Sequence, residues 1–294
     1  MQRKTSTPCN GSGRAVLVTG ASTGIGAACA LALDRLGWRV FAGIRDDEAG
    51  RRLAERASSR FVPLWIDVTD SAQIDAAAEQ IAETLGDNGL DGLVNNAGIG
   101  VLGPLEAVPI DDLRRQLEVN VLGQIAVTQA MLPLLRRSAG RIVMMGSVSG
   151  RVASPYMGPY AASKFALEAV TDALRVELRR WKIAVSIIEP GSVVTPIWDK
   201  AKTSARRLAD TLSPEMMRFY GEEIETFEQV ADEFATAAMP VDRVVDAVVH
   251  ALTARRPRTR YPLGLSARLS IRLLPLVPDR IRDWIVCRAI GLRR

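Results

Sequence analysis

Short apolar segments alternate with longer helical stretches along most of the 294-residue chain. Six of these segments are largely apolar, so we expect them to be strands that are covered on both faces. They span residues 14–18, 39–44, 61–66, 90–95, 141–145 and 183–189. Each of the first five leads into a helical stretch before the next strand, a repeat that builds parallel sheets through right-handed crossovers. The sequence therefore predicts an α/β fold with a doubly wound, Rossmann-like parallel sheet in a three-layer α/β/α arrangement.

The cysteines and the apolar runs indicate the cellular compartment of the protein. Cys9, Cys29 and Cys287 are scattered and have neither the spacing of a disulfide framework nor that of metal ligands, so we expect no metal site and a reducing compartment. The polar amino terminus lacks the apolar region of a signal peptide, and no apolar run is long enough to span a bilayer. These features predict a cytoplasmic protein.

The positive charge is concentrated at the carboxy-terminal end. The net charge is +5, but residues 255–294 carry +9 and the rest of the chain carries −4. Such clusters usually face solvent. In residues 263–290 leucine, isoleucine and valine alternate with arginine, so this part could also form amphipathic helices on an anionic membrane, or a surface for a dimer partner. No aromatic-rich basic platform accompanies the charge, so we expect no nucleic-acid partner.

A glycine-rich turn follows the first predicted strand. Gly20, Gly24 and Gly26 lie between this strand and a predicted helix over residues 27–36. Backbone N–H groups at such a helix N-terminus favour an anion above the sheet edge. The spacing G-x-x-x-G-x-G differs from the common G-x-G-x-x-G, and alone it could be a tight connection. Its position after the first strand of a βαβ unit favours the pyrophosphate of a dinucleotide.

Tyr160 and Lys164 are four residues apart and follow Ser147 by thirteen and seventeen positions. Residues at this spacing share one face of a helix, so the ammonium can lower the pKa of the phenol. A phenol with a lowered pKa can exchange a proton near neutral pH. Together with the glycine turn, the pair predicts carbonyl and alcohol redox chemistry on a nicotinamide cofactor.

The order of these motifs resembles that of the short-chain dehydrogenase/reductase superfamily. The resemblance covers about residues 14–255 and is closest in character to the retinol and hydroxysteroid dehydrogenase branch. It rests on Thr19-Gly20-x-x-x-Gly24-Ile25-Gly26, Asn95-Asn96-Ala97-Gly98, Ser147, Tyr160-x-x-x-Lys164 and Pro190-Gly191. It implies an NAD(P)-dependent oxidoreductase that interconverts an alcohol and its ketone or aldehyde.

The resemblance also implies individual roles. Tyr160 would be the general acid and base, Ser147 would hydrogen-bond the substrate oxygen, and Lys164 would also bind the nicotinamide ribose. Asn120 would support a water-mediated proton path to Lys164, although an Asn within a helix can simply face water. The implied cofactor contacts are Gly20, Ser22, Thr23, Gly24, Ile25, Gly26, Arg45, Asp67, Val68, Asn95, Ala97, Gly98, Tyr160, Lys164, Pro190, Gly191, Val193 and Thr195.

The end of the second strand bears on the choice of cofactor. NAD-preferring relatives carry an acidic residue there, whereas this chain has Arg45, which could clamp the 2′-phosphate of NADP. Two features oppose this: Thr23 is neutral where many NADP-preferring relatives are basic, and Asp46 and Asp47 could cap the next helix and partly neutralise Arg45. We expect NADP, with NAD as the alternative.

Apolar residues predict a hydrophobic substrate such as a steroid, retinoid or other lipid. The expected contacts are Ile99, Val101, Val148, Val152, Met157, Ile197, Trp198, Met216, Met217 and Phe219. A 3-ketoacyl-thioester (carrier-protein) reductase would share the same catalytic residues and is the alternative. A non-catalytic, dinucleotide-sensing regulator is a more remote one. We assign no catalytic role to His250, which lies in an apolar helix.

The domain division follows from these motifs. We expect a flexible N-terminal segment (1–13), one dinucleotide-binding and catalytic domain (14–255) and a basic, amphipathic helical extension (256–294). Relatives usually assemble through two long helices, which here span about residues 113–136 and 158–181. A homodimer or homotetramer is therefore expected.

Overall fold

Seven parallel strands form a single sheet in the order β3-β2-β1-β4-β5-β6-β7. The computed structural model describes residues 13–195, 203, 206–222 and 238–289. The strands are β1 (Ala15–Val18), β2 (Arg39–Ile44), β3 (Phe61–Trp65), β4 (Gly92–Asn95), β5 (Arg141–Met145), β6 (Ala184–Pro190) and β7 (Arg260–Leu263). Strand order reverses between β1 and β4, which makes this a topological switch point. The predicted doubly wound fold is confirmed.

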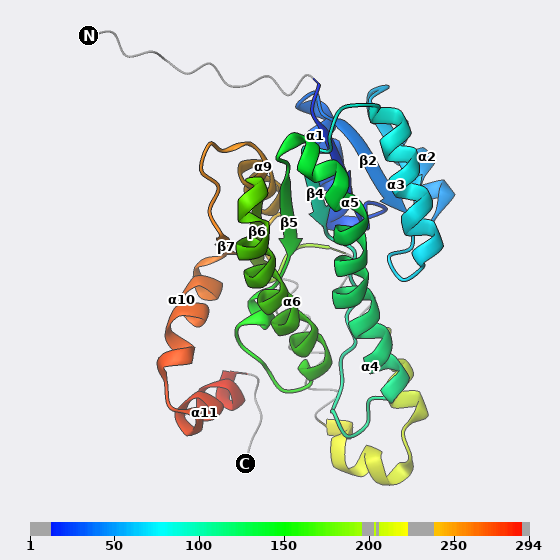
Figure 1. The fold of residues 1–294 in the computed structure, drawn as a ribbon. Coiled ribbons are helices and arrows are strands. Elements are labelled where there is room, and N and C mark those ends of the chain that lie inside the picture. Colours follow the sequence, from blue (N-terminus) through cyan, green and yellow to red (C-terminus); the bar gives the residue numbers. More distant parts are fainter. Residues whose placement is uncertain (1–12, 196–202, 204–205, 223–237, 290–294) are drawn as a thin grey trace, which may run out of the picture.

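Helices cover both faces of the sheet (Figure 1). They are α1 (Gly24–Arg35), α2 (Asp47–Ala54), α3 (Ser71–Leu85), α4 (Ile110–Leu117), α5 (Gly123–Ser138), α6 (Gly158–Glu177), α9 (Asp242–Thr253), α10 (Leu265–Leu273) and α11 (Asp279–Ala289). Residues of α3, α5 and α6 form one buried apolar cluster with the sheet. Residues of α1, α2 and α9 form the other. The three layers are therefore α/β/α.

The alternation of side chains along each strand supplies both clusters. In β1, Ala15 and Leu17 belong to the first cluster, while Val16 and Val18 belong to the second. All four are at most 1% exposed. Burying one such Val or Leu side chain stabilises the fold by about 1.5–3 kcal/mol. A strand that is apolar on both faces is thus stable only between two helical layers.

Strand β7 was not predicted from the sequence. It forms the edge of the sheet and pairs with β6, so the sheet extends beyond residue 255, where we expected the domain to end. Pro262 lies within it, which an edge strand tolerates. Tyr261 is buried, and its hydroxyl lies 2.8 Å from Nδ1 of His250. His250 is thus an exposed residue that packs edge-on against Tyr261 of the edge strand and hydrogen-bonds it.

One helical feature also differs from the expectation. The long helix expected over residues 113–136 is interrupted between α4 and α5 by a π-helical turn, η1 (Glu118–Leu122). After α5 the chain turns through Ala139, which is left-handed with φ 49°. A Cβ on Gly140 would lie 2.3 Å from the Leu90 carbonyl oxygen, so this glycine is required for the close approach of two backbones.

The segments that carry the motifs all follow the carboxyl ends of strands. In Figure 1 the arrowheads of the strands point toward the end of the molecule where α10, α11 and the helical residues 206–211 and 214–222 lie. This edge of a doubly wound sheet is where such folds bind ligands. Within the described ranges, no helix combines the length and the apolar character that crossing a bilayer requires.

Candidate active site and dinucleotide site

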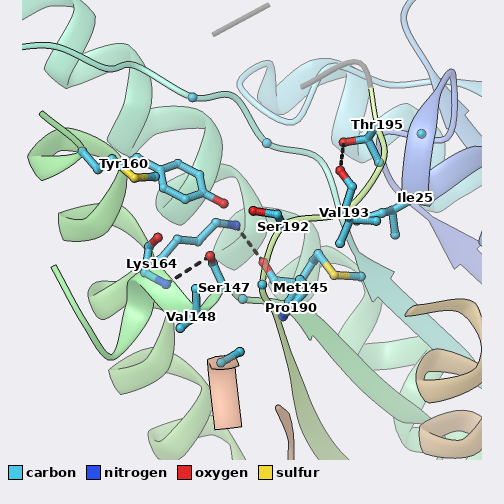
Figure 2. A pocket seen from close by; sticks show the side chains of 18 of the residues that line it. Ile25, Met145, Ser147, Val148, Tyr160, Lys164, Pro190, Ser192, Val193 and Thr195 are labelled. Carbon is cyan, nitrogen blue, oxygen red and sulfur yellow. Dashed lines mark hydrogen bonds between the residues drawn. The ribbon is translucent and has the colours of Figure 1, made fainter. Parts of the chain in front are cut away.

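A cavity of about 840 Å³ lies at the carboxyl edge of the sheet. It is lined by the loops that follow β1, β4, β5 and β6, by the start of α6, and by parts of α10 and α11. In Figure 2, Ser147, Tyr160 and Lys164 lie together on one side of this space, while Ile25, Val193 and Thr195 lie on another. The site thus brings the three catalytic candidates and the glycine-rich turn to one cavity.

The glycine turn has the geometry of an anion cradle. Gly20 and Gly24 adopt φ values of 63° and 57°, which favour glycine. A Cβ on Gly26 would lie 2.2 Å from the Gly20 carbonyl oxygen. Helix α1 begins here, and Thr23 at its N-cap makes no side-chain hydrogen bond to the first turn within the described chain. The N–H groups at the start of α1 are available to a pyrophosphate, so the residues fit a dinucleotide.

The cavity lining includes most of the residues that the sequence assigned to the cofactor. These are Gly20, Ser22, Thr23, Gly24, Ile25, Arg45, Val68, Ala97, Gly98, Tyr160, Lys164, Pro190, Gly191, Val193 and Thr195. Three assigned residues, Gly26, Asp67 and Asn95, are not among the described residues that line it. Gly26 acts through close packing of the turn, as its contact with Gly20 shows.

Arg45 pairs with Asp67 and not with the residues that follow it. Its Nη1 lies 3.0 Å from Oδ2 of Asp67. Burial by itself would raise the pKa of Asp67, but hydrogen bonds from Thr69 and Arg45 outweigh it and lower this pKa. Asp46 instead caps α2, accepting a hydrogen bond from the backbone N–H of Glu48 at 2.9 Å. The cap expected from the sequence is present, but the neutralising partner of Arg45 is Asp67.

The two adjacent asparagines have different positions. Asn95 ends β4 inside the core, where its Nδ2 donates to Thr128 Oγ1 at 2.8 Å and so braces β4 against α5. Asn96 lines the cavity, and its Nδ2 donates to the carbonyl oxygens of Thr19 and Gly20 at 3.0 and 3.1 Å. Asn96 therefore holds the glycine turn in place. Asn96 is part of the sequence motif, but no role was predicted for it.

The catalytic candidates Ser147, Tyr160 and Lys164 line one region of the cavity. Lys164 is 4% exposed, and its Nζ donates to the Met145 carbonyl oxygen at 2.7 Å. The same Nζ lies 5.6 Å from the centroid of the Tyr160 ring. Ser147 caps the short turn η2 (Val148–Gly150), where its Oγ accepts from the Ser149 N–H. The end of β5 thus orients both Ser147 and Lys164.

Burial dominates the protonation of this group. It lowers the pKa of Lys164 to about 8, and the negative charge of Glu168 opposes that shift. Burial raises the pKa of Tyr160, and hydrogen bonding with Ser147 lowers it in part. The lowered phenol pKa expected from the sequence is therefore not found in this structure, because desolvation exceeds the effect of the neighbouring groups. Lys164 is the group placed to titrate just above neutral pH.

Asn120 lies in the π-helical turn η1 and is fully buried. Its Oδ1 accepts from the Ile99 N–H at 2.8 Å. Its Nδ2 donates to the Ile99 carbonyl oxygen at 3.0 Å and to Ser163 Oγ at 3.1 Å. Asn120 is not among the described residues that line the cavity. It fixes the loop at Ile99 and contacts α6 next to Lys164, so any link to that lysine is indirect.

The apolar wall of the cavity differs in part from the expected set. Ile99, Val148, Val152 and Met157 line it. Val101 packs in a separate buried cluster, and the described residues Met216, Met217 and Phe219 do not line the cavity. Ile197 and Trp198 lie outside the described residues. The carboxy-terminal extension adds Leu265, Ala267, Leu274, Ile285 and Val286, which the sequence did not assign to the site.

The comparisons with known proteins agree with this geometry. Residues 14–206 match the family model described as short chain dehydrogenase. The chain therefore belongs to the short-chain dehydrogenase/reductase family, whose members bind NAD(P), and it is an oxidoreductase of the retinol and hydroxysteroid dehydrogenase branch. Both the predicted family and the predicted branch are confirmed.

Three relatives illustrate the match. The NADPH-dependent 3-dehydrocapnine reductase of Ornithobacterium rhinotracheale is 36% identical, with 92% of this chain and 95% of that protein covered. Retinol dehydrogenase 5 of Mus musculus is 37% identical, with 93% and 89% covered. A short chain dehydrogenase from Burkholderia cenocepacia J2315, solved in complex with NADP, is 28% identical with a TM-score of 0.71, covering 95% of this chain and 98% of that one.

Among the described residues, no three His, Cys, Asp or Glu side chains are grouped so that they could hold a metal ion.

Proposed function

We propose that the protein interconverts a hydrophobic alcohol and its ketone or aldehyde, with Tyr160 as the general acid and base. One observation carries this proposal: the glycine turn and the group Ser147, Tyr160 and Lys164 line the same cavity. The walls between them are apolar. A carbonyl compound and a nicotinamide would meet there. A steroid, a retinoid or a long-chain lipid is the substrate class that suits such walls.

Each polar group has a distinct role in the proposed reaction. The bound nicotinamide supplies or accepts the hydride. The hydroxyl groups of Ser147 and Tyr160 hold the substrate oxygen, and Tyr160 donates its proton to that oxygen during reduction. Protonated Lys164 stabilises the resulting phenolate, since an opposite charge favours the ionised form. In alcohol oxidation the same phenolate takes the proton back.

NADP is the proposed cofactor. Arg45 follows β2 at the adenosine end, lines the cavity and is about half exposed, so it can turn from Asp67 toward a 2′-phosphate. A guanidinium suits a phosphate because it can donate two parallel hydrogen bonds. The names of two relatives support this choice, since one is NADPH-dependent and the other was solved with NADP.

The substrate class is tested with a panel and NADPH. Absorbance of the reduced nicotinamide would be followed against steroid and retinoid carbonyls, 3-dehydrocapnine and a short acetoacetyl thioester. Turnover of the lipophilic compounds is the expected result. Turnover of the thioester alone would contradict the proposal and favour the 3-ketoacyl-thioester reductase. NADPH binding without turnover of any compound would favour the non-catalytic regulator.

The extension beyond β7 supports a peripheral membrane contact. Its helices line the cavity, yet they also expose large apolar side chains: Leu265, Leu269, Leu273, Leu276, Ile281 and Trp284. Arginines interleave with them, as in helices that lie on anionic membranes. We therefore assign the protein to the cytoplasm with reversible membrane binding. Flotation with phosphatidylserine vesicles tests this: Leu276→Ser with Trp284→Ser should reduce binding, and equal binding would contradict it.

A homodimer or homotetramer is the proposed assembly. Leu117, Leu122, Phe165 and Val176 are exposed apolar residues along α4, η1 and α6, the helices through which relatives usually assemble. Light scattering of the purified protein would show a dimer or tetramer, and a monomer would contradict this assignment.

A further inference from the structure

Glu168 lies next to Lys164, where α6 packs against the turn η2. It follows Lys164 by four residues on α6, so both side chains share one helix face. The η2 turn that carries Ser147 packs on the same place, since a Cβ on Gly150 would lie 3.2 Å from Glu168 Cγ. The Glu168 side chain is 8% exposed. Solvent therefore screens the interaction between the Glu168 charge and Lys164 only weakly.

Glu189 is a second buried carboxyl group at this place. It lies on β6 immediately before Pro190 and Gly191, which line the cavity. Its side chain is 1% exposed, and neither carboxyl oxygen has a hydrogen-bond donor among the described residues; the same holds for Oε1 of Glu168. The two carboxyl groups lie within hydrogen-bonding reach of each other. Because ionised carboxylates only accept, that bond requires one proton between them.

The surrounding charges come from every element packed against the pair. Arg260 on β7 contacts Glu168 at 2.8 Å and Asp172 at 2.9 Å, and its Nε lies 3.8 Å from Glu189. Arg151, after the η2 turn, lies 3.9 Å from Glu168. Arg175 pairs with Asp172 and does not reach the two glutamates. Three arginines therefore face three carboxylates, but the contacts of Arg151 with Glu168 and of Arg260 Nε with Glu189 are long, at 3.9 and 3.8 Å, so Glu189 has no close cation.

Burial and mutual repulsion favour one retained proton. Burial, and then the charge of Glu168, raise the pKa of Glu189 to about 7. Burial also raises the pKa of Glu168, although Arg260 and Arg151 oppose the shift. Two adjacent carboxyls that cannot both ionise easily titrate as a pair.

We propose that Glu168 and Glu189 form a proton-sharing pair that sets the charge behind Lys164 and Tyr160 and thereby positions the alkaline limit of carbonyl reduction. Glu168 and Glu189 are positioning residues, because they act through Lys164 and not on the substrate. This inference rests on the proposed function. A negative charge raises the pKa of both a lysine and a tyrosine, so the pair keeps both groups protonated to a higher pH.

The pH profile of kcat tests the proposal in the direction of ketone reduction. Glu168→Gln should move the alkaline limb down by about one pH unit, because the negative charge nearest Lys164 is lost. Asp172→Asn is the matched control: it removes a carboxylate from the same Arg260, but Asp172 is 45% exposed and two helical turns from Lys164. The alkaline limb of the pH profile of Asp172→Asn should match that of the wild type. Equal shifts in both variants, or none in Glu168→Gln, would overturn the proposal.

An infrared measurement tests the shared proton without any turnover. The carbonyl stretch of a protonated carboxyl is separate from the carboxylate bands, so the wild type should show it at about pH 6 and lose it as the pH rises through about 7. Glu189→Gln should lack the band. A band that persists in this variant, or that the wild type never shows, would overturn the pair. A wild type with the band but without turnover would instead contradict the proposed function.

Discussion

Replacing Glu189 by glutamine should change the pH dependence of stability in a defined direction. The ordinary glutamate pKa of 4.5 rises to about 7 in the folded protein. A folded-state pKa above the unfolded value means that the stabilising contribution is complete below about pH 4.5 and is lost as the pH rises through about 7. The whole shift corresponds to about 3 kcal/mol, since one unit is worth about 1.4 kcal/mol.

The expected effect between about pH 5 and pH 8 is somewhat smaller, at about 2 kcal/mol, because part of the shift acts below pH 5 and Glu168 shares the proton. Glutamine keeps the size of the side chain and cannot ionise. Urea unfolding of both proteins at the two pH values gives the free energies. Relative to the wild type, Glu189→Gln should gain about 2 kcal/mol as the pH rises.

Other titrating groups cancel in this difference, because distant sites contribute nearly equally to both proteins. Asp172→Asn provides a control: hydrogen bonding with Arg260 lowers the pKa of Asp172 below its ordinary value of 3.8, so its contribution is complete at both pH 5 and pH 8, and the stability difference between this variant and the wild type should stay constant over that range. A stability difference between Glu189→Gln and the wild type that stays constant from pH 5 to pH 8 would refute the reasoning.

Three further predictions concern the site itself. Because the pKa of Lys164 is about 8, kcat for ketone reduction should fall as the pH rises through that value; a rate that stays flat to pH 10 would contradict the assignment. Arg45→Ala should raise KM for NADPH about tenfold and change KM for NADH little, because one charge-assisted hydrogen bond to the 2′-phosphate is lost. Steady-state kinetics with both cofactors measure this, and equal effects on the two would show that Arg45 does not reach the phosphate. Gly26→Ala should abolish NADPH binding in a fluorescence titration, since its Cβ would collide with the Gly20 carbonyl oxygen, whereas wild-type affinity would refute the importance of that contact.

Five of the six predicted strands could be read from the sequence because they bury both faces; the edge strand β3, which exposes Trp65, is the exception. Apolar runs such as Ala15–Val18 leave few alternatives once helical stretches separate them. Strand β7 could not be read in the same way. It is an edge strand of four residues that begins with Arg260 and contains Pro262, so it lacks the apolar signal of the inner strands.

The parts of the site that were missed depend on tertiary structure. Asn95 and Asn96 are neighbours in the motif, but the register of β4 turns the first into the core and leaves the second at the cavity. At Asn120 a π-helical turn replaces the expected α-helix, and the side chain there contacts Ile99 and Ser163, which are distant in the sequence. Glu168 and Glu189 come from a helix and a strand, and nothing in their local sequence indicates that they meet.

The carboxy-terminal extension shows the limit of an amphipathic pattern. Its leucines and arginines are compatible with solvent, with a membrane or with the protein's own core. In the structure the extension does two things: Leu274 and Ile285 line the cavity, while Leu276 and Trp284 are exposed. The position of β7 directs α10 across the carboxyl edge of the sheet. This placement, which the sequence pattern does not contain, decides which apolar residues line the cavity and which are exposed.

The most direct test of the central claim compares wild-type protein with Tyr160→Phe. NADPH consumption would be measured with the lipophilic carbonyl panel, and NADPH binding by fluorescence titration. Because phenylalanine cannot donate a proton, kcat should fall by at least about a hundredfold while the affinity for NADPH stays within about twofold. A Tyr160→Phe variant that reduces the same substrate at the wild-type rate would contradict the account.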